Sequence, residues 1–253
     1  MLRHFSSDGV HIAYIDVAPQ GEDRGEPIIL IHGFASNHRI NWVNPRWVDT
    51  LTRAGRRVVA LDNRGHGASQ KLYAPPDYRS DLMARDASSL LAHLRIERAD
   101  VLGYSMGARI GAFLALARPH LVRSLILGGL GERLVHGVGL PVGIADAMEA
   151  PSLADLSDPT QRMFRAFAER TRSDLKALAA CIRGSRQTVS EKGVGLIAVP
   201  TLIAPRLVVL AARARVAAFF FACAPACLNA RAAAFVSFTS AAWSAFSTRT
   251  SIR

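Results

Sequence analysis

Histidine and acidic residues are absent from the last part of the chain. No histidine follows His136, and no aspartate or glutamate follows Glu191. Residues 205–253 also contain no glycine, lysine or glutamine. Glycine makes up about 7% of average protein sequences, so an ordered segment of this length should contain several. The segment therefore differs in composition from the rest of the chain, and it supplies no imidazole or carboxylate to any site.

Cysteine is scarce, and its positions form no disulfide framework. Cys181, Cys223 and Cys227 are an odd set, which is typical of a reducing compartment and predicts a cytoplasmic location. Cys223 and Cys227 have neither a second cysteine pair nor a histidine near them in the sequence, so we expect no metal site. We expect no other cofactor.

Long apolar runs are also absent. Residues 1–9 are polar, so we expect no secretory signal. An apolar stretch at 216–228 has 13 residues, contains Pro225 and is flanked by arginines, whereas a membrane span needs about 20 residues. We therefore expect no membrane partner, and anchoring of this stretch at a membrane surface stays open as an alternative.

The formal net charge of +11 would by itself favour nucleic acid or an anionic membrane as a partner. Six of the basic residues, however, are arginines in residues 205–253, and the rest of the chain has no basic run interleaved with aromatic residues. We therefore expect a small-molecule partner and no nucleic acid. Binding of nucleic acid or membrane through the arginine-rich tail is a third hypothesis.

The apolar patterns predict one α/β domain with a mostly parallel, doubly wound sheet. A chain of 253 residues is long enough for one such domain and too short for two. Two strands joined by a tight turn are expected to start the sheet in antiparallel fashion. Continuous apolar runs, typical of strands buried on both faces, then alternate with segments of helical period. The expected strands are 2–5, 11–17, 27–31, 58–61, 101–104 and 125–127, and the expected helices include 81–96 and 108–119.

A further helix is expected to begin at Pro45. Asn44 is a good N-cap residue, and proline is favoured at the first helical position. The apolar face of this helix is formed by Trp47, Val48 and Leu51, and Gly55 follows its end.

The pattern changes after residue 130. Loosely amphipathic helices, including 161–169 and 173–183, predict a helical lid, and an apolar run at 199–203 then returns to the sheet. The predicted organisation is a core over 1–130, a lid over 131–195, a return strand over 196–204 and an aberrant tail over 205–253.

One stretch joins a strand, a sharp turn and a helix at a serine. The strand ends in Gly103-Tyr104-Ser105-Met106-Gly107, and the helical period begins directly afterwards. A G-x-S-x-G turn in this setting presents the serine hydroxyl above the sheet as a nucleophile. Gly103 and Gly107 are expected to flank the turn because strand and helix approach too closely there for a Cβ atom.

With two other motifs, this turn resembles the α/β-hydrolase family. In the family's order, the motifs are an apolar strand ending in HGF (32–34), a loop of the form D-x-R-G-x-G-x-S (62–69), and the serine turn. The resemblance covers roughly residues 1–204. It implies the α/β-hydrolase fold with a helical lid, and Ser105 as the nucleophile that attacks a small ester or related acyl substrate.

The resemblance also implies the remaining site residues. The backbone N–H groups of Phe34 and Met106 would form the oxyanion hole. His32 and His66 are interpreted as packing residues of their loops and not as catalytic bases.

The family's catalytic acid and histidine have no counterpart. In this family the acid follows the return strand and the histidine comes last, so both would lie beyond Ile203, where the chain has neither. We interpret the tail as the product of a reading-frame change near codon 204; a sequencing error would give the same chain. Glu132 as acid with His136 as base is an alternative.

The functional prediction is therefore a serine hydrolase whose activity is impaired. A serine is a weak nucleophile without a base, and loss of the triad histidine lowers turnover by about 10⁶. From the same resemblance, we expect the final strand and helix of the family fold to be missing or replaced. A non-catalytic protein that binds a small apolar ligand in the same pocket is the alternative function.

Overall fold

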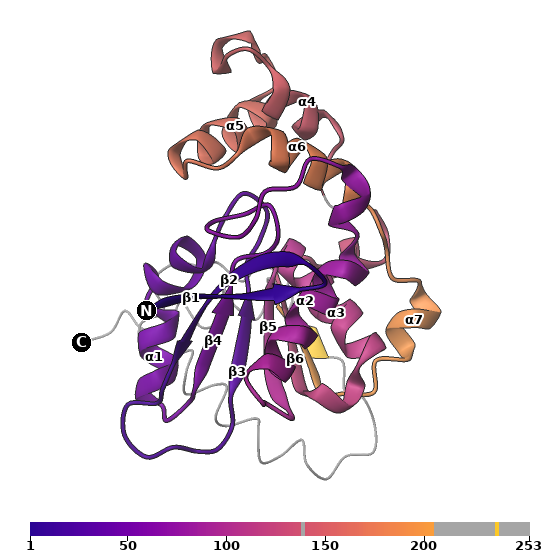
Figure 1. Cartoon of the computed structure of the whole chain (residues 1–253). Coiled ribbons are helices and arrows are strands. Elements are labelled where there is room, and N and C mark those ends of the chain that lie inside the picture. Colours follow the sequence, from indigo (N-terminus) through magenta and orange to yellow (C-terminus); the bar gives the residue numbers. More distant parts are fainter. Residues whose placement is uncertain (138–139, 205–235, 238–253) are drawn as a thin grey trace, which may run out of the picture.

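The computed structural model describes residues 1–137, 140–204 and 236–237, which build a mixed eight-stranded sheet (Figure 1). The strand order is β1-β2-β4-β3-β5-β6-β7-β8. β2 is antiparallel to both β1 and β4, and all other neighbouring strands run parallel, as the sequence predicted. The strands are β1 (Leu2–Ser7), β2 (Val10–Val17), β3 (Ile28–Ile31), β4 (Val58–Leu61), β5 (Ala99–Tyr104), β6 (Val122–Gly128), β7 (Thr201–Ala204) and β8 (Val236–Ser237).

Helices cover both faces of the sheet. Successive residues of a strand point to opposite faces, so the fully buried strands supply both apolar layers. Leu30 packs in the layer that contains α1, whereas Ile29 packs in the layer that contains α2 and α3. These helices are α1 (Trp47–Arg53), α2 (Ser80–His93) and α3 (Met106–Ala117), and short helical turns lie at Arg39–Val43, Pro75–Tyr78, Pro119–Leu121, Gly131–Leu134 and Leu153–Asp155.

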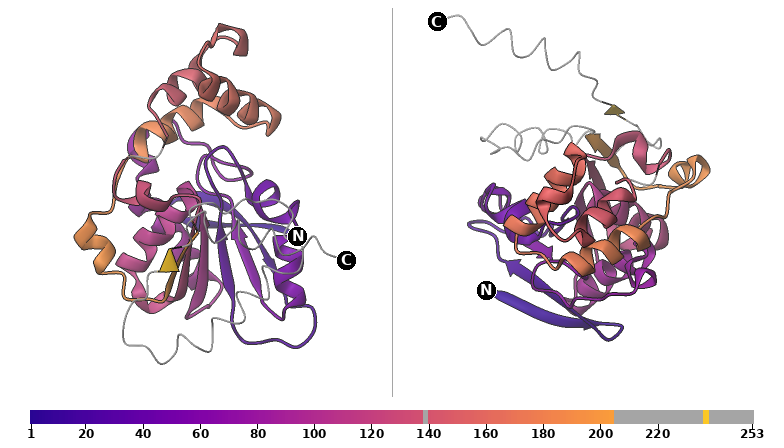
Figure 2. Two further views of the ribbon diagram at one scale, coloured as in Figure 1. Left: turned by 180° about the vertical axis from the view of Figure 1, so that it is seen from behind. Right: turned by 90° about the horizontal axis from the view of Figure 1, so that it is seen from above.

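Three helices form a separate group beyond the carboxyl ends of the parallel strands (Figures 1 and 2). They are α4 (Gly143–Glu149), α5 (Pro159–Arg170) and α6 (Leu175–Gly184). Their buried residues pack against one another and against Phe34 and Tyr78, which belong to loops of the sheet domain. α7 (Glu191–Gly195) lies beside the sheet domain and away from this group (Figure 2). The predicted lid segment, 131–195, therefore includes both the helical group and α7.

The predicted start of α1 is wrong. Asn44 has right-handed helical angles and closes the preceding turn, because its backbone N–H donates to Arg39 O at 2.8 Å. Arg46 then adopts a left-handed conformation, with φ of 67°, and α1 begins at Trp47. The asparagine therefore ends one helical turn instead of capping the next helix.

Most of the tail lies outside the described residues. Within it, β8 pairs in parallel with β7 at the edge where the family's final strand was expected to be missing or replaced. Cys223, Cys227 and the apolar stretch 216–228 lie outside the described residues. Among the helices that the structure describes, none has the length and apolar character needed to cross a membrane.

The turn between β5 and α3 depends on a close approach of backbones. A Cβ atom on Gly107 would lie 2.0 Å from the carbonyl oxygen of Ile31 in β3. A Cβ atom on Gly103 would lie 2.2 Å from the carbonyl oxygen of Gly107. Real Cβ atoms do not approach backbone so closely, so only glycine fits at both positions. At both positions the added Cβ atom would therefore meet backbone atoms of a neighbouring segment.

Gly107→Ala should lower the free energy of unfolding by about 1–3 kcal/mol or more, because the added methyl group meets backbone atoms that cannot rotate away. Urea denaturation followed by circular dichroism measures the change. Gly195→Ala in α7 is the matched control: its Cβ would meet nothing within 4 Å, and alanine is the better helix former. A Gly107→Ala variant as stable as the wild type would mean that α3 can move away from β3.

Candidate active site

The strand order opens a crevice between β3 and β5. The chain leaves β3 toward α1 on one face of the sheet, and it leaves β5 toward α3 on the other face. Where connections diverge in this way, a parallel sheet has a crevice at the carboxyl ends of its strands. The loop that follows β3 and the turn at Ser105 both border this crevice. Two motifs that are far apart in the sequence therefore meet there.

Ser105 has a strained backbone conformation at the start of α3. Its φ is 53° and its ψ is −113°, a combination that costs a non-glycine residue about 1–3 kcal/mol. Its N–H donates to the carbonyl of Gly128 at 2.7 Å, which ties the turn to the end of β6. Met106 is the first residue of α3, so its N–H has no acceptor within the helix. The turn thus presents a hydroxyl and a free backbone donor side by side.

His32 fixes the direction of the second expected donor, the N–H of Phe34. The Asn63 N–H donates to Nε2 of His32 at 2.9 Å, so Nδ1 carries the proton and donates to the Gly33 carbonyl at 2.7 Å. The Gly33 carbonyl and the Phe34 N–H belong to one planar peptide unit and point in opposite directions. The hydrogen bond from His32 therefore fixes the Gly33–Phe34 peptide so that the Phe34 N–H points away from the imidazole.

The two histidines of these loops are neutral packing residues, as the sequence predicted. Both His32 and His66 are fully buried, and their rings lie 5.3 Å apart between centroids. Burial lowers the pKa of His32, and it lowers the pKa of His66 to about 3. Neither ring lines the cavities described next.

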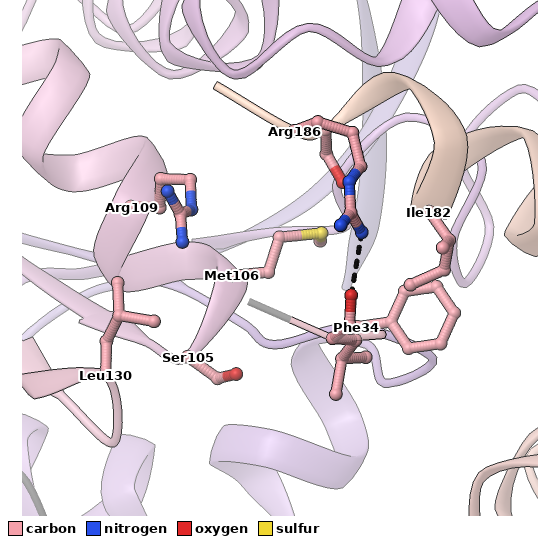
Figure 3. A pocket seen from close by; sticks show the side chains of 9 residues that line it. Phe34, Ser105, Met106, Arg109, Leu130, Ile182 and Arg186 are labelled. Atoms are coloured by element: carbon pink, nitrogen blue, oxygen red, sulfur yellow. Dashed lines mark hydrogen bonds between the residues drawn. The ribbon is translucent and has the colours of Figure 1, made fainter. Parts of the chain in front are cut away.

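Ser105 lies between two cavities. The larger, of about 340 Å³, is mainly apolar and lies beneath α5. The smaller, of about 40 Å³, lies between α3 and the end of α6, and Figure 3 shows its lining side chains. Phe34 lines both cavities, and Met106 lines the smaller one. The residues predicted as nucleophile and oxyanion donors are therefore brought together at one place.

Several lining residues were not identified from the sequence. Arg109 and Arg186 line the smaller cavity, and Phe164 and Phe167 line the larger one. Arg109 could have been found, because it lies one helical turn after Ser105 and so on the same side of α3. The other three come from the helical group and the segment after it, and no spacing rule connects them to the serine.

The described lining of the two cavities offers Ser105 no imidazole and no carboxylate. The described residues that line them include no histidine, aspartate, glutamate or lysine. The alternative pair does not reach the site either. Glu132 and His136 are exposed, and His136 Nε2 faces the carboxylate of Glu191 at 3.4 Å. Among the described residues, no group of three or more potential ligands is arranged to hold a metal ion.

A buried carboxylate joins the loop after β4 to the loop after β3. Asp62 accepts hydrogen bonds from the backbone N–H groups of His38, at 2.7 Å, and Ala68, at 2.8 Å. Its carboxylate also contacts Nδ1 of His38 at 2.8 Å. Burial by itself would raise the pKa of Asp62, but the hydrogen bonds from the side chain and the backbone of His38 hold it at about 2. The charged carboxylate therefore fixes both loops at the edge of the site.

The depressed pKa of Asp62 predicts acid sensitivity. A carboxyl group with a folded-state pKa of about 2 and an ordinary value of 3.8 stabilises the fold by about 2 kcal/mol at neutral pH. This contribution is complete above about pH 5 and is lost as the pH falls toward 2. Asp62→Asn should therefore be less stable than the wild type at pH 7, and the difference should shrink in acid.

Urea denaturation between pH 7 and pH 3 measures this difference. Asp8→Asn is the control, because Asp8 forms an exposed ion pair with Arg85 at 3.0 Å, and such pairs contribute little. A difference between the wild type and Asp62→Asn that stays constant with pH would contradict the assignment.

Comparisons with known proteins agree with this geometry. A sequence model of the alpha/beta hydrolase fold matches residues 26–185, which is more than half of the chain. The dihydrolipoyllysine-residue acetyltransferase component of the acetoin cleaving system of Pseudomonas putida is 37% identical over 117 residues, 45% of this chain and 30% of that protein. The 2-hydroxy-6-oxononadienedioate/2-hydroxy-6-oxononatrienedioate hydrolase of Paraburkholderia xenovorans is 37% identical over 132 residues, 51% of this chain and 44% of that protein. The chain thus spans less than half the length of these relatives.

Solved structures show the same fold. A hydrolase from Pseudomonas aeruginosa superposes with a TM-score of 0.61 and 25% identity, over 80% of this chain and 78% of that one. An esterase from Exiguobacterium antarcticum gives a TM-score of 0.64 at 20% identity, over 80% of each chain, and that likeness concerns the fold alone. With the family match, the strand order and the serine turn taken together, this chain belongs to the alpha/beta hydrolase fold family.

Proposed function

We propose that this protein is a serine hydrolase of the alpha/beta hydrolase family that acts on a small ester or related acyl substrate. One observation carries the proposal: Ser105 lies in a strained turn, between two cavities, beside the backbone donors Phe34 and Met106. The names of similar proteins, which include a hydrolase of Paraburkholderia xenovorans and a hydrolase from Pseudomonas aeruginosa, support hydrolysis as the reaction class.

The proposed chemistry is acyl transfer to Ser105. The Oγ atom attacks the substrate carbonyl, its proton passes to solvent water because the described lining offers no imidazole or carboxylate, and the carbonyl π electrons move to the oxygen. The N–H groups of Phe34 and Met106 stabilise that oxyanion, and each such donor is typically worth about 2.7–4 kcal/mol in the transition state. Collapse releases the alcohol, which takes up a proton, and water then hydrolyses the acyl-enzyme.

The acyl chain is assigned to the larger cavity. Its walls include Tyr104, Phe164 and Phe167, which offer apolar surface next to Ser105. Residues 131–195, which include the helical group, serve as a lid. This lid covers a core formed by residues 1–130 and the return strand 196–204. Thr171 supports this role, because its Oγ1 atom lies 3.2 Å from the carbonyl oxygen of Ala35 in the loop after β3, and 3.0 Å from that of Ala168 in α5.

The missing base is the reason to propose impaired activity. Among the described residues that line the cavities of Ser105, there is no imidazole and no carboxylate. The positions at which the family supplies them fall in the tail, which contains no histidine, aspartate or glutamate. Oxyanion donors and binding alone give about 10³–10⁴ over the uncatalysed reaction. The same observation favours a second function, binding of a small ligand without catalysis.

A serine-directed fluorophosphonate should label Ser105 slowly, and added imidazole should accelerate the labelling because it can act as the absent base. Intact mass spectrometry over time, with peptide mapping, measures the rate and the site. Ser105→Ala should not be labelled. Ser88→Ala is the matched control, because Ser88 lies in α2 and donates only to the Arg85 carbonyl; it should behave as the wild type. A chain that binds esters but is not labelled, even with imidazole, would favour the binding function.

The reading-frame hypothesis predicts a result at the level of the gene. Resequencing across codons 195–215, with translation of all three downstream frames, should reveal a glycine-containing loop with an aspartate and, later, a histidine in another frame. A chain restored to that frame should then hydrolyse a simple ester far faster than the present one. If no frame encodes these residues, the tail is genuine, and the usual triad has to be abandoned for this protein.

A further inference from the structure

Two arginines line the smaller cavity beside Ser105. Arg109 comes from the first turn of α3, and Arg186 comes from the segment directly after α6. In Figure 3 the two guanidinium groups lie on either side of the Met106 side chain, Arg109 on α3 and Arg186 toward Ile182. The cavity therefore carries positive charge from two elements that are far apart in the sequence.

Neither arginine has an acidic partner in the described part of the chain. Arg109 donates to the carbonyls of Gln187, at 2.6 Å, and Arg133, at 2.9 Å. Arg186 donates to the Leu140 carbonyl at 2.7 Å. Each guanidinium has five N–H donors, so both keep donors that these bonds do not use.

This absence sets Arg109 apart from the other buried arginines. Among the described residues, four arginines are buried, and three of them pair with a carboxylate. Arg56 pairs with Asp100, Arg64 with Asp86 and Arg165 with Glu169. Arg109 is 3% exposed, and its hydrogen-bond partners in the described part of the chain are backbone carbonyls. A buried charge without a counter-charge is costly, so this position calls for an anion that the chain does not supply.

The charges of the two arginines act on each other. Burial lowers the pKa of Arg109, and the nearby positive charge of Arg186 lowers it further. An anion between the two guanidinium groups would offset the burial of the Arg109 charge and its repulsion by Arg186.

The cavity has a volume of about 40 Å³. One water needs about 10–15 Å³ on this measure, so the cavity has room for a group of a few atoms. A carboxylate has this size, and its two oxygens match the geometry of guanidinium donors.

We propose that Arg109 and Arg186 form a subsite for a carboxylate that the substrate itself carries, close to the carbonyl attacked by Ser105. The inference rests on the proposed function, because it assigns the substrate class of the same site. The substrate is then a small acyl compound with two unlike ends, an anionic group in the smaller cavity and an apolar group in the larger one. A half-ester of a short dicarboxylic acid has this chemistry.

The test measures binding and does not depend on turnover. In full-length Ser105→Ala, isothermal titration calorimetry compares monomethyl succinate, glutarate and adipate with the matching methyl ester amides, in which a neutral amide replaces the carboxylate. At least one half-ester should bind about tenfold more tightly than its amide, which is the scale expected for a charge-assisted hydrogen bond. Adding Arg186→Gln should abolish this preference.

Arg183→Gln is the matched control. Arg183 lies in α6, three residues before Arg186, pairs with the exposed carboxylate of Glu149 and lines neither cavity. The Ser105→Ala/Arg183→Gln protein should keep the preference. The comparison between half-esters and amides also stands without any arginine variant, so misfolding of Arg186→Gln would not remove the test.

Three outcomes would overturn the subsite: no half-ester binds more tightly than its amide, the preference survives Arg186→Gln, or acetate binds as tightly as the half-esters. The last outcome would show a site for free anions. Failure of the proposed function is a separate result. Half-ester preference without fluorophosphonate labelling of Ser105 would keep the subsite in a binding protein, whereas labelling without preference would keep the serine chemistry and remove the subsite.

Discussion

The contact between α3 and β3 at Gly107 is the constraint on which the site depends. Because only a hydrogen atom fits between this residue and the Ile31 carbonyl, the helix can start directly over the end of the neighbouring strand. The chain must then turn within one residue, and Ser105 takes the strained angles that this turn requires. The same turn leaves the Met106 N–H free at the helix start. The close contact at Gly107 therefore determines where both the Ser105 hydroxyl and the Met106 N–H lie.

The other half of the site is held by polar groups instead of close packing. His32 orients the Gly33 peptide through one hydrogen bond, and Asp62 fastens the loop after β3 to the loop after β4 through His38. These groups are buried, so losing a partner costs more than the net value of one hydrogen bond. The two halves differ in their response to conditions. The glycine contact has no dependence on pH, whereas the Asp62 network weakens in acid.

The sequence was sufficient where local pattern and backbone geometry decide the structure. Buried apolar runs predicted the parallel strands, and the glycines around Ser105 predicted a tight turn at which a Cβ atom would meet backbone. The sequence-based prediction failed at Asn44. Asparagine favours the N-cap position, but here it closes the helical turn that precedes α1. The prediction also missed Arg186 and Phe164, because tertiary packing of the helical group, and no spacing in the chain, brings them to the serine.

Binding and chemical activation are separable in this chain. Among the described residues, those that line the cavities, including the two arginines, precede residue 205. Activation of the hydroxyl needs a base, and no histidine or carboxylate follows Glu191 to supply one. Electrostatic stabilisation of an oxyanion is built into the folded backbone and costs no reorganisation during reaction. Under the proposed function, ligand selectivity would depend on the cavities, whereas the rate would depend on a proton transfer for which their described lining offers no imidazole or carboxylate.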